Sequence, residues 1–124
     1  MSKLIIAITG RPESGKTTFA EQQARQTGLP IIHTDDIIDT GLSWNELPDY
    51  AIKVLPEKCI VEGVLVARML GQPGFDPDIV HLCTWKGPVQ PGHESFTTMV
   101  ESKCRKWSQE TGRIVFVEER PYEE

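Results

Sequence analysis

The chain has 124 residues, a formal net charge of −5 at pH 7 and a 39% share of hydrophobic residues. Its length suits one domain, covering 1–124, with enough residues to bury a core. The acidic charge argues against a general nucleic-acid binder, which usually has a basic surface, but not against an enzyme that acts on one end of a nucleic acid. The strongly apolar run at residues 4–8 is too short for a signal peptide or a membrane span.

Cysteine usage agrees with this picture. The three cysteines, Cys59, Cys83 and Cys104, are widely spaced and contain no C-x-x-C pair, which favours reduced thiols over disulfides or a metal site. We therefore expect a cytoplasmic protein without a membrane partner.

The first predicted strand, residues 3–9, leads directly into a phosphate-binding motif. Residues 10–17 form a complete G-x-x-x-x-G-K-[ST] pattern, and a helix is predicted at 16–27, where Gly28 ends it. Glycines let successive N–H groups turn inward around a polyphosphate, and the helix N-terminus adds positive potential at the same point. The predicted nucleotide-binding residues are Gly10, Arg11, Pro12, Glu13, Ser14, Gly15, Lys16, Thr17 and Thr18.

Side chains of this loop have separate predicted roles. Lys16 brings a full positive charge to the outer phosphates. The Thr17 hydroxyl is placed to coordinate magnesium, and Thr18 adds a phosphate contact from the first helical turn.

Carboxylates follow the next two predicted strands. Asp35 and Asp36 come after the strand at 30–33, and Glu62 follows the strand at 58–61. At the edge of the sheet that carries the phosphate loop, a carboxylate can accept a proton from an attacking hydroxyl, hold a magnesium-bound water or orient a substrate. The alternative is a structural role, because Asp also favours helix N-termini and turns, and Glu62 would then be a solvated strand end.

The remaining elements continue the alternation of helix and strand. Helices are predicted at 46–55, 64–70 and 94–111, and strands at 78–83 and 113–117, with a Pro/Gly-rich loop at 85–92. His81 and Cys83 share one face of a predicted strand, but a metal site would need further ligands. Five apolar strands between helices predict a parallel sheet covered on both faces.

These motifs together resemble the small P-loop kinases. The quoted segments are G-x-P-x-S-G-K-T-T, Thr34-Asp35-Asp36 and Val61-Glu62-Gly63. The group includes nucleoside and nucleotide kinases, shikimate- and gluconate-type kinases, zeta-toxin kinases and the kinase domain of polynucleotide kinase, and the resemblance covers most of the chain in element order. It implies an α/β P-loop NTPase fold, a three-layer sandwich with a five-stranded parallel sheet in the order 2-3-1-4-5.

The resemblance also implies an activity and its cofactors. The chain would be a magnesium-dependent phosphotransferase that uses ATP or another nucleoside triphosphate. Polynucleotide kinases have Asp-Asp after the second strand with the first Asp as base, which implies that Asp35 is catalytic together with Lys16. Uridine kinases have a similar Glu-Gly after the third strand, which matches Glu62 and Gly63. The match implies that Glu62 and Thr17 are the metal ligands.

The segments that would contact the nucleobase and form the lid resemble those of the small P-loop kinases less closely. In the resembling kinases the nucleobase lies near the loop after the last strand, here residues 118–121. This implies that the nucleobase stacks on Arg120 and that selection between nucleobases is loose. Their lid carries arginines, whereas residues 84–93 contain none. Asp36, Arg68 and Lys86 are the candidate substrate or phosphate contacts, with Lys103 as a further one. Trp44 would either stack on a substrate ring or pack locally.

Three functions remain open. The first is a kinase whose acceptor is a small molecule or the end of a nucleic acid. The second is an NTP-binding hydrolase or switch, although no guanine-reading N/T-K-x-D motif is present. The third is a degenerate P-loop protein with a structural or regulatory role.

Overall fold

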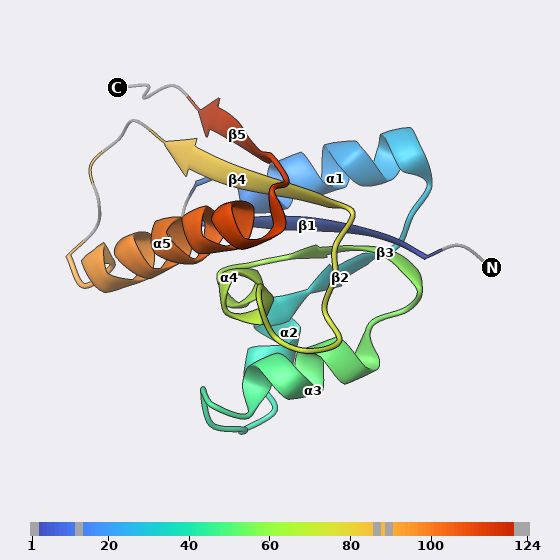
Figure 1. Cartoon of the computed structure of the whole chain (residues 1–124), viewed down its shortest axis with the longest axis horizontal. Helices are drawn as coiled ribbons and strands as arrows, with labels where there is room; N and C mark the ends of the chain where they lie inside the picture. The colour runs from blue at the N-terminus through green and yellow to red at the C-terminus, as the bar shows by residue number, and fades with distance from the viewer. Residues whose placement is uncertain (1–2, 12–13, 86–87, 89–90, 121–124) are drawn as a thin grey trace.

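A five-stranded parallel sheet forms the centre of the computed structural model, which describes residues 3–11, 14–85, 88 and 91–120 without the side chains of Trp85 and Arg120 (Figure 1). The strands are β1 (Leu4–Gly10), β2 (Ile31–His33), β3 (Lys58–Glu62), β4 (Ile79–Trp85) and β5 (Val115–Arg120). The helices are α1 (Lys16–Thr27), α2 (Thr34–Ile38), α3 (Leu47–Val54), α4 (Leu65–Met69) and α5 (Glu94–Thr111). The spatial order β2-β3-β1-β4-β5 confirms the predicted sheet.

Alternating side chains of the strands build two cores, one on each face of the sheet. In β1, Ile5 and Ala7 belong to a large cluster, while Ile6 and Ile8 belong to a smaller one on the opposite face. Because both faces of β1 are buried, the strand reads as a continuous apolar run rather than as an alternating one.

The helices cover the two faces unequally. α1 packs against β1, β2 and β3 on one face, and α4 and α5 pack on the other, with α2 and α3 against α4 (Figure 1). Within the described residues, no helix is both long enough and apolar enough to cross a membrane.

Two parts of the sequence prediction need correction. No helix was predicted at 34–38, but Asp35 and Asp36 lie in the first turn of α2, which is only five residues long and too short to produce a helical periodicity. Residues 118–120 belong to β5 rather than to a loop, because they pair with 83–85 of β4. That pairing supplies backbone hydrogen bonds that the local sequence Glu-Glu-Arg does not signal.

Candidate functional site

The phosphate-binding motif lies between β1 and α1, as predicted, and its two glycines serve different purposes. Gly15 precedes α1 with φ 82°, a left-handed conformation that favours glycine. Gly10 is required for space, because a Cβ there would lie 2.4 Å from the carbonyl oxygen of Cys83 in β4. The backbone of the loop can therefore turn tightly beside the end of the sheet.

Lys16 begins α1, and its ammonium group donates a hydrogen bond to the carbonyl oxygen of Arg11 at 3.2 Å. Burial lowers the pKa of Lys16, and the charges of Glu62 and Asp35 partly oppose that shift. Two of the three predicted carboxylates, Glu62 and Asp35, are thus electrostatic neighbours of the loop lysine. The nearby Ser14 hydroxyl is buried and has no hydrogen-bond partner among the described residues.

Glu62 joins three elements through one carboxylate oxygen. The Thr17 hydroxyl donates to Oε1 at 3.3 Å, and His33 Nδ1 lies 2.6 Å from the same atom. The side chain of Glu62 is only 4% exposed, so these contacts hold a carboxylate that has little access to water. Strand register explains the meeting, because His33 and Ile8 are the pairing partners of Glu62 in β2 and β1.

His33 was missed in the sequence analysis. Its signal was its position: it ends the second strand, and Glu62 ends the third strand, which is its neighbour in the predicted order. Because parallel strands end at the same edge, the two side chains could be expected to meet there.

Asp35 and Asp36 are both exposed, but only Asp35 is among the charges that act on Lys16. Their helix is held against the residue that follows β3 by a close contact. Gly63 has φ 140°, and a Cβ there would lie 1.8 Å from the hydroxyl oxygen of Thr34. The position of Asp35 relative to Glu62 is therefore set by a backbone approach that only glycine permits.

Magnesium fits the residues at the head of α1. Thr17 and Glu62 place a hydroxyl oxygen and a carboxylate oxygen 3.3 Å apart, and Mg²⁺ prefers such hard oxygen ligands. Among the described residues, no cluster of three or more His, Cys, Asp or Glu could hold a metal ion by itself. A site with few protein ligands is typical of magnesium that is bound jointly with phosphates.

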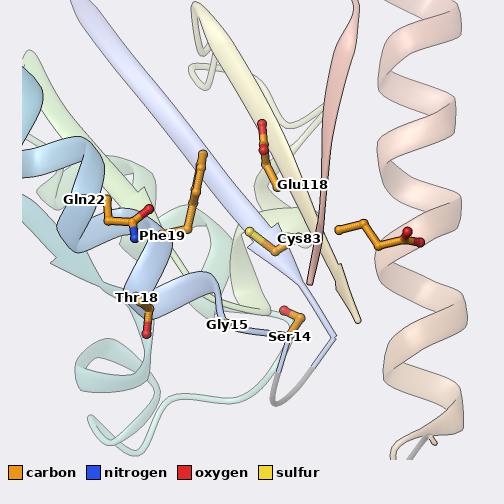
Figure 2. A pocket seen from close by; sticks show the side chains of 8 residues that line it. Ser14, Gly15, Thr18, Phe19, Gln22, Cys83 and Glu118 are labelled. Carbon is orange, nitrogen blue, oxygen red and sulfur yellow. The ribbon is translucent and has the colours of Figure 1, made fainter. Parts of the chain in front are cut away.

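A hollow of about 400 Å³ opens beside the loop, between α1 and the ends of β4 and β5 (Figure 2). It is lined by Ser14, Gly15, Thr18, Phe19, Gln22, Cys83, Glu118 and Glu119. Burial raises the pKa of the Cys83 thiol to about 12, with a further contribution from the charge of Glu118. Phe19 and Gln22 were not predicted, although their spacing from Gly15 and Thr18 places them on the helix face that begins at the loop.

The remaining predicted site residues do not all belong to the described part of the chain. Pro12, Glu13 and Lys86, like the side chain of Arg120, lie outside the described residues. Arg68 is on α4, where its guanidinium lies 5.4 Å from the ring centre of Trp44. Lys103 lines the hollow that contains this pair.

Several known structures are similar to this one. A thymidylate kinase from Ehrlichia chaffeensis matches with a TM-score of 0.52 and 14% identity, over 100% of this chain and 91% of that chain. A possible uridine kinase from Bacillus stearothermophilus matches with a TM-score of 0.49 and 15% identity, over 95% and 89% of the two chains. A shikimate kinase from Bacteroides thetaiotaomicron matches with a TM-score of 0.49 and 12% identity, over 94% of this chain and 85% of that chain.

No protein-family model matches the chain, and no curated protein sequence matches it significantly. The likeness to thymidylate kinase shows the α/β fold of P-loop kinases. The narrower resemblance to polynucleotide kinases and zeta-toxin kinases stays a prediction.

Proposed function

We propose that the chain is a single-domain P-loop phosphotransferase that transfers the γ-phosphoryl group of a magnesium nucleoside triphosphate to an acceptor hydroxyl. One observation carries the proposal: Lys16 and Thr17 at the head of α1 share their surroundings with the carboxylates of Glu62 and Asp35. This reaction requires a cation that binds the phosphates, oxygen ligands that bind magnesium and a base that accepts the proton of the acceptor hydroxyl.

The nucleotide would bind with its phosphates along the loop and its base toward the hollow beside α1. Backbone N–H groups of the loop and Lys16 would hold the outer phosphates, and the buried Ser14 hydroxyl would find its missing partner in a phosphate oxygen. The hollow contains Phe19 for apolar contact and the Gln22 amide for hydrogen bonding. We expect base selection to be loose, because apolar contact with Phe19 does not distinguish the edges of the bases.

Asp35 would accept the proton of the acceptor hydroxyl. The hydroxyl oxygen then forms a bond to the γ-phosphorus while the bond from that phosphorus to the β–γ bridging oxygen breaks, and the diphosphate leaves with the electron pair. Lys16 would offset the charge on the transferring group. Thr17 and Glu62 would hold magnesium, which supplies further charge neutralisation when bound, and His33 would keep the Glu62 carboxylate oriented.

The test begins with nucleotide binding. Lys16→Ala should weaken binding of magnesium ATP by at least about tenfold in calorimetry, because it removes a charge-assisted contact and no core packing. Equal affinities of wild type and variant would contradict the nucleotide site.

Asp35 and Asp36 provide a matched pair for the transfer step. A panel of nucleosides, sugars and 5′-hydroxyl oligonucleotides is first screened for acceptor-dependent formation of ADP. Asp35→Asn should then lower kcat by about 10²–10⁴-fold with nucleotide affinity preserved, and Asp36→Asn should cost much less. A larger loss in Asp36→Asn would overturn the assignment, and ADP formation independent of every acceptor would favour the hydrolase alternative.

A further inference from the structure

A second hollow, of about 430 Å³, lies between the segment that follows α2 and the helices α4 and α5. It is lined by Trp44, Arg68, Ser95, Phe96, Met99 and Lys103. The α5 residues 96, 99 and 103 lie three and four positions apart, so they form one stripe of that helix facing the hollow. None of its lining residues belongs to the phosphate loop.

The apolar part of the hollow is built from aromatic and flexible side chains. The rings of Trp44 and Phe96 lie 6.0 Å apart and are tilted by 48°. Trp44 is 38% exposed, so part of its ring is open to a ligand, and the Met99 thioether adds an adaptable surface. Such a wall suits a flat ring, which would gain apolar burial and aromatic contact.

The charged part of the hollow is positive. Of the described residues, Arg68 and Lys103 line it and no carboxylate does, although the chain as a whole carries a net charge of −5. Within the described residues neither cation pairs with a carboxylate. The Arg68 guanidinium stacks over Trp44, and a stacked guanidinium keeps its in-plane N–H donors available for an anion.

The hollow is connected to the candidate catalytic residues through two short elements. Arg68 lies on α4, which begins two residues after Gly63 and contacts α2. Trp44 lies in the segment that follows Asp35 and α2. The hollow is therefore built on the helix that follows Glu62 and on the segment that follows Asp35.

We propose that this hollow binds the phosphoryl acceptor, and that the acceptor combines a flat ring with an anionic group. The ring would lie against Trp44, Phe96 and Met99, and the anion would pair with Arg68. This inference rests on the proposed function for its catalytic meaning, but binding at the hollow can be measured without any transfer. The anionic group is a phosphate or a carboxylate, and the choice of probes distinguishes them.

The experiment separates the ring from the charge. Two kinds of probe carry a flat ring and an anionic group: nucleoside 5′-monophosphates, whose anion is a phosphate, and 4-hydroxybenzoate, whose anion is a carboxylate. Uridine carries the ring alone, and ribose 5-phosphate carries the anion alone. Calorimetry and tryptophan fluorescence are recorded with Lys16→Ala protein, in which the phosphate loop is impaired. At least one ring-bearing anion should bind about tenfold or more tightly than uridine and ribose 5-phosphate, and should change the fluorescence.

Variants of the hollow then locate the binding. Arg68→Gln should weaken that ligand about tenfold or more, and Trp44→Leu should both weaken it and remove the fluorescence change. Arg105→Gln, an exposed change on α5 with the same loss of charge, should leave the affinity unaltered. Arg68 is a sharper test than Lys103, because Lys103 also borders a smaller hollow with Lys106 and Glu110.

Two results would overturn the inference. One is that no ring-bearing anion of the panel binds in the millimolar range. The other is that Arg68→Gln and Arg105→Gln bind the ring-bearing anion with the same affinity. Either result leaves the nucleotide site intact if Lys16→Ala still abolishes ATP binding in otherwise wild-type protein. Conversely, binding that depends on Arg68 but not on Lys16 supports the hollow even if no transfer is ever detected.

Discussion

At the scale of single residues, Lys16 shows a conflict between stability and function. Burial lowers its pKa, and the carboxylates of Glu62 and Asp35 offset this effect only in part. The folded chain therefore holds an ammonium group where the charged form is disfavoured. A polyphosphate would compensate that charge far better than the carbonyl oxygen of Arg11, so the unfavourable burial becomes a source of binding free energy.

This conflict predicts that Lys16→Met stabilises the nucleotide-free protein at neutral pH while it abolishes nucleotide binding. The sign follows from linkage: the folded-state pKa of Lys16 lies below its ordinary 10.5, so the free energy of unfolding rises as pH increases toward 10.5. The variant lacks that rise, and the gap between the two proteins should narrow with pH. Denaturation curves from about pH 7 to about pH 10 measure it; this range lies below the pKa of about 12 that burial gives the Cys83 thiol, the buried thiol whose titration depends on Lys16.

A variant that is less stable than wild type throughout this range would contradict the prediction. The second readout is ligand-induced stabilisation: magnesium ATP should raise the melting temperature of wild type but not that of Lys16→Met.

At the scale of elements, the contact between Gly63 and Thr34 joins the end of β3 to α2. Gly63→Ala would place its Cβ against the Thr34 hydroxyl at a φ of 140°, so we expect a loss of roughly 2–4 kcal/mol in unfolding free energy. Gly71→Ala is the control, because Gly71 also has positive φ but open space around it, and torsional strain alone should cost about 1 kcal/mol. Urea denaturation measures both.

A double variant tests the cause. Thr34→Ala should be almost neutral alone, because its buried hydroxyl has no partner among the described residues, and it should recover part of the loss in Gly63→Ala. Purely additive effects would show that the two residues do not clash.

Elements also show how far the sequence can predict this molecule. The phosphate loop and the long helices were predictable because glycine punctuation and periodicity are local signals, and Glu94–Thr111 was predicted to the residue. The short helix α2 and the extension of β5 depend on tertiary contacts that no local pattern records. The contact of His33 with Glu62 could have been inferred from the predicted strand order, whereas the hollow around Arg68 depends on how separate helices pack and became visible only in the structure.

At the scale of the whole molecule, the two edge strands of the sheet differ in length and exposure. β2 is an edge strand of only three residues, whereas β5 is an edge strand of six. Within the described residues no further strand pairs with β5, and Ile114, Phe116 and Val117 at this edge are exposed. A long, apolar edge with unpaired N–H and C=O groups favours association between copies of the chain.

Val117→Lys should therefore reduce aggregation without a cost in stability. Val117 is 60% exposed, so the change removes little packing and should alter the unfolding free energy by no more than about 0.5 kcal/mol, while a charge on the edge opposes strand pairing between molecules. Val54→Lys is the matched control, because Val54 is 44% exposed and ends α3, away from the sheet edge. Light scattering during slow heating measures aggregation, and urea denaturation measures stability. Equal suppression by both variants would assign the effect to net charge, and no suppression by Val117→Lys would show that β5 does not direct aggregation.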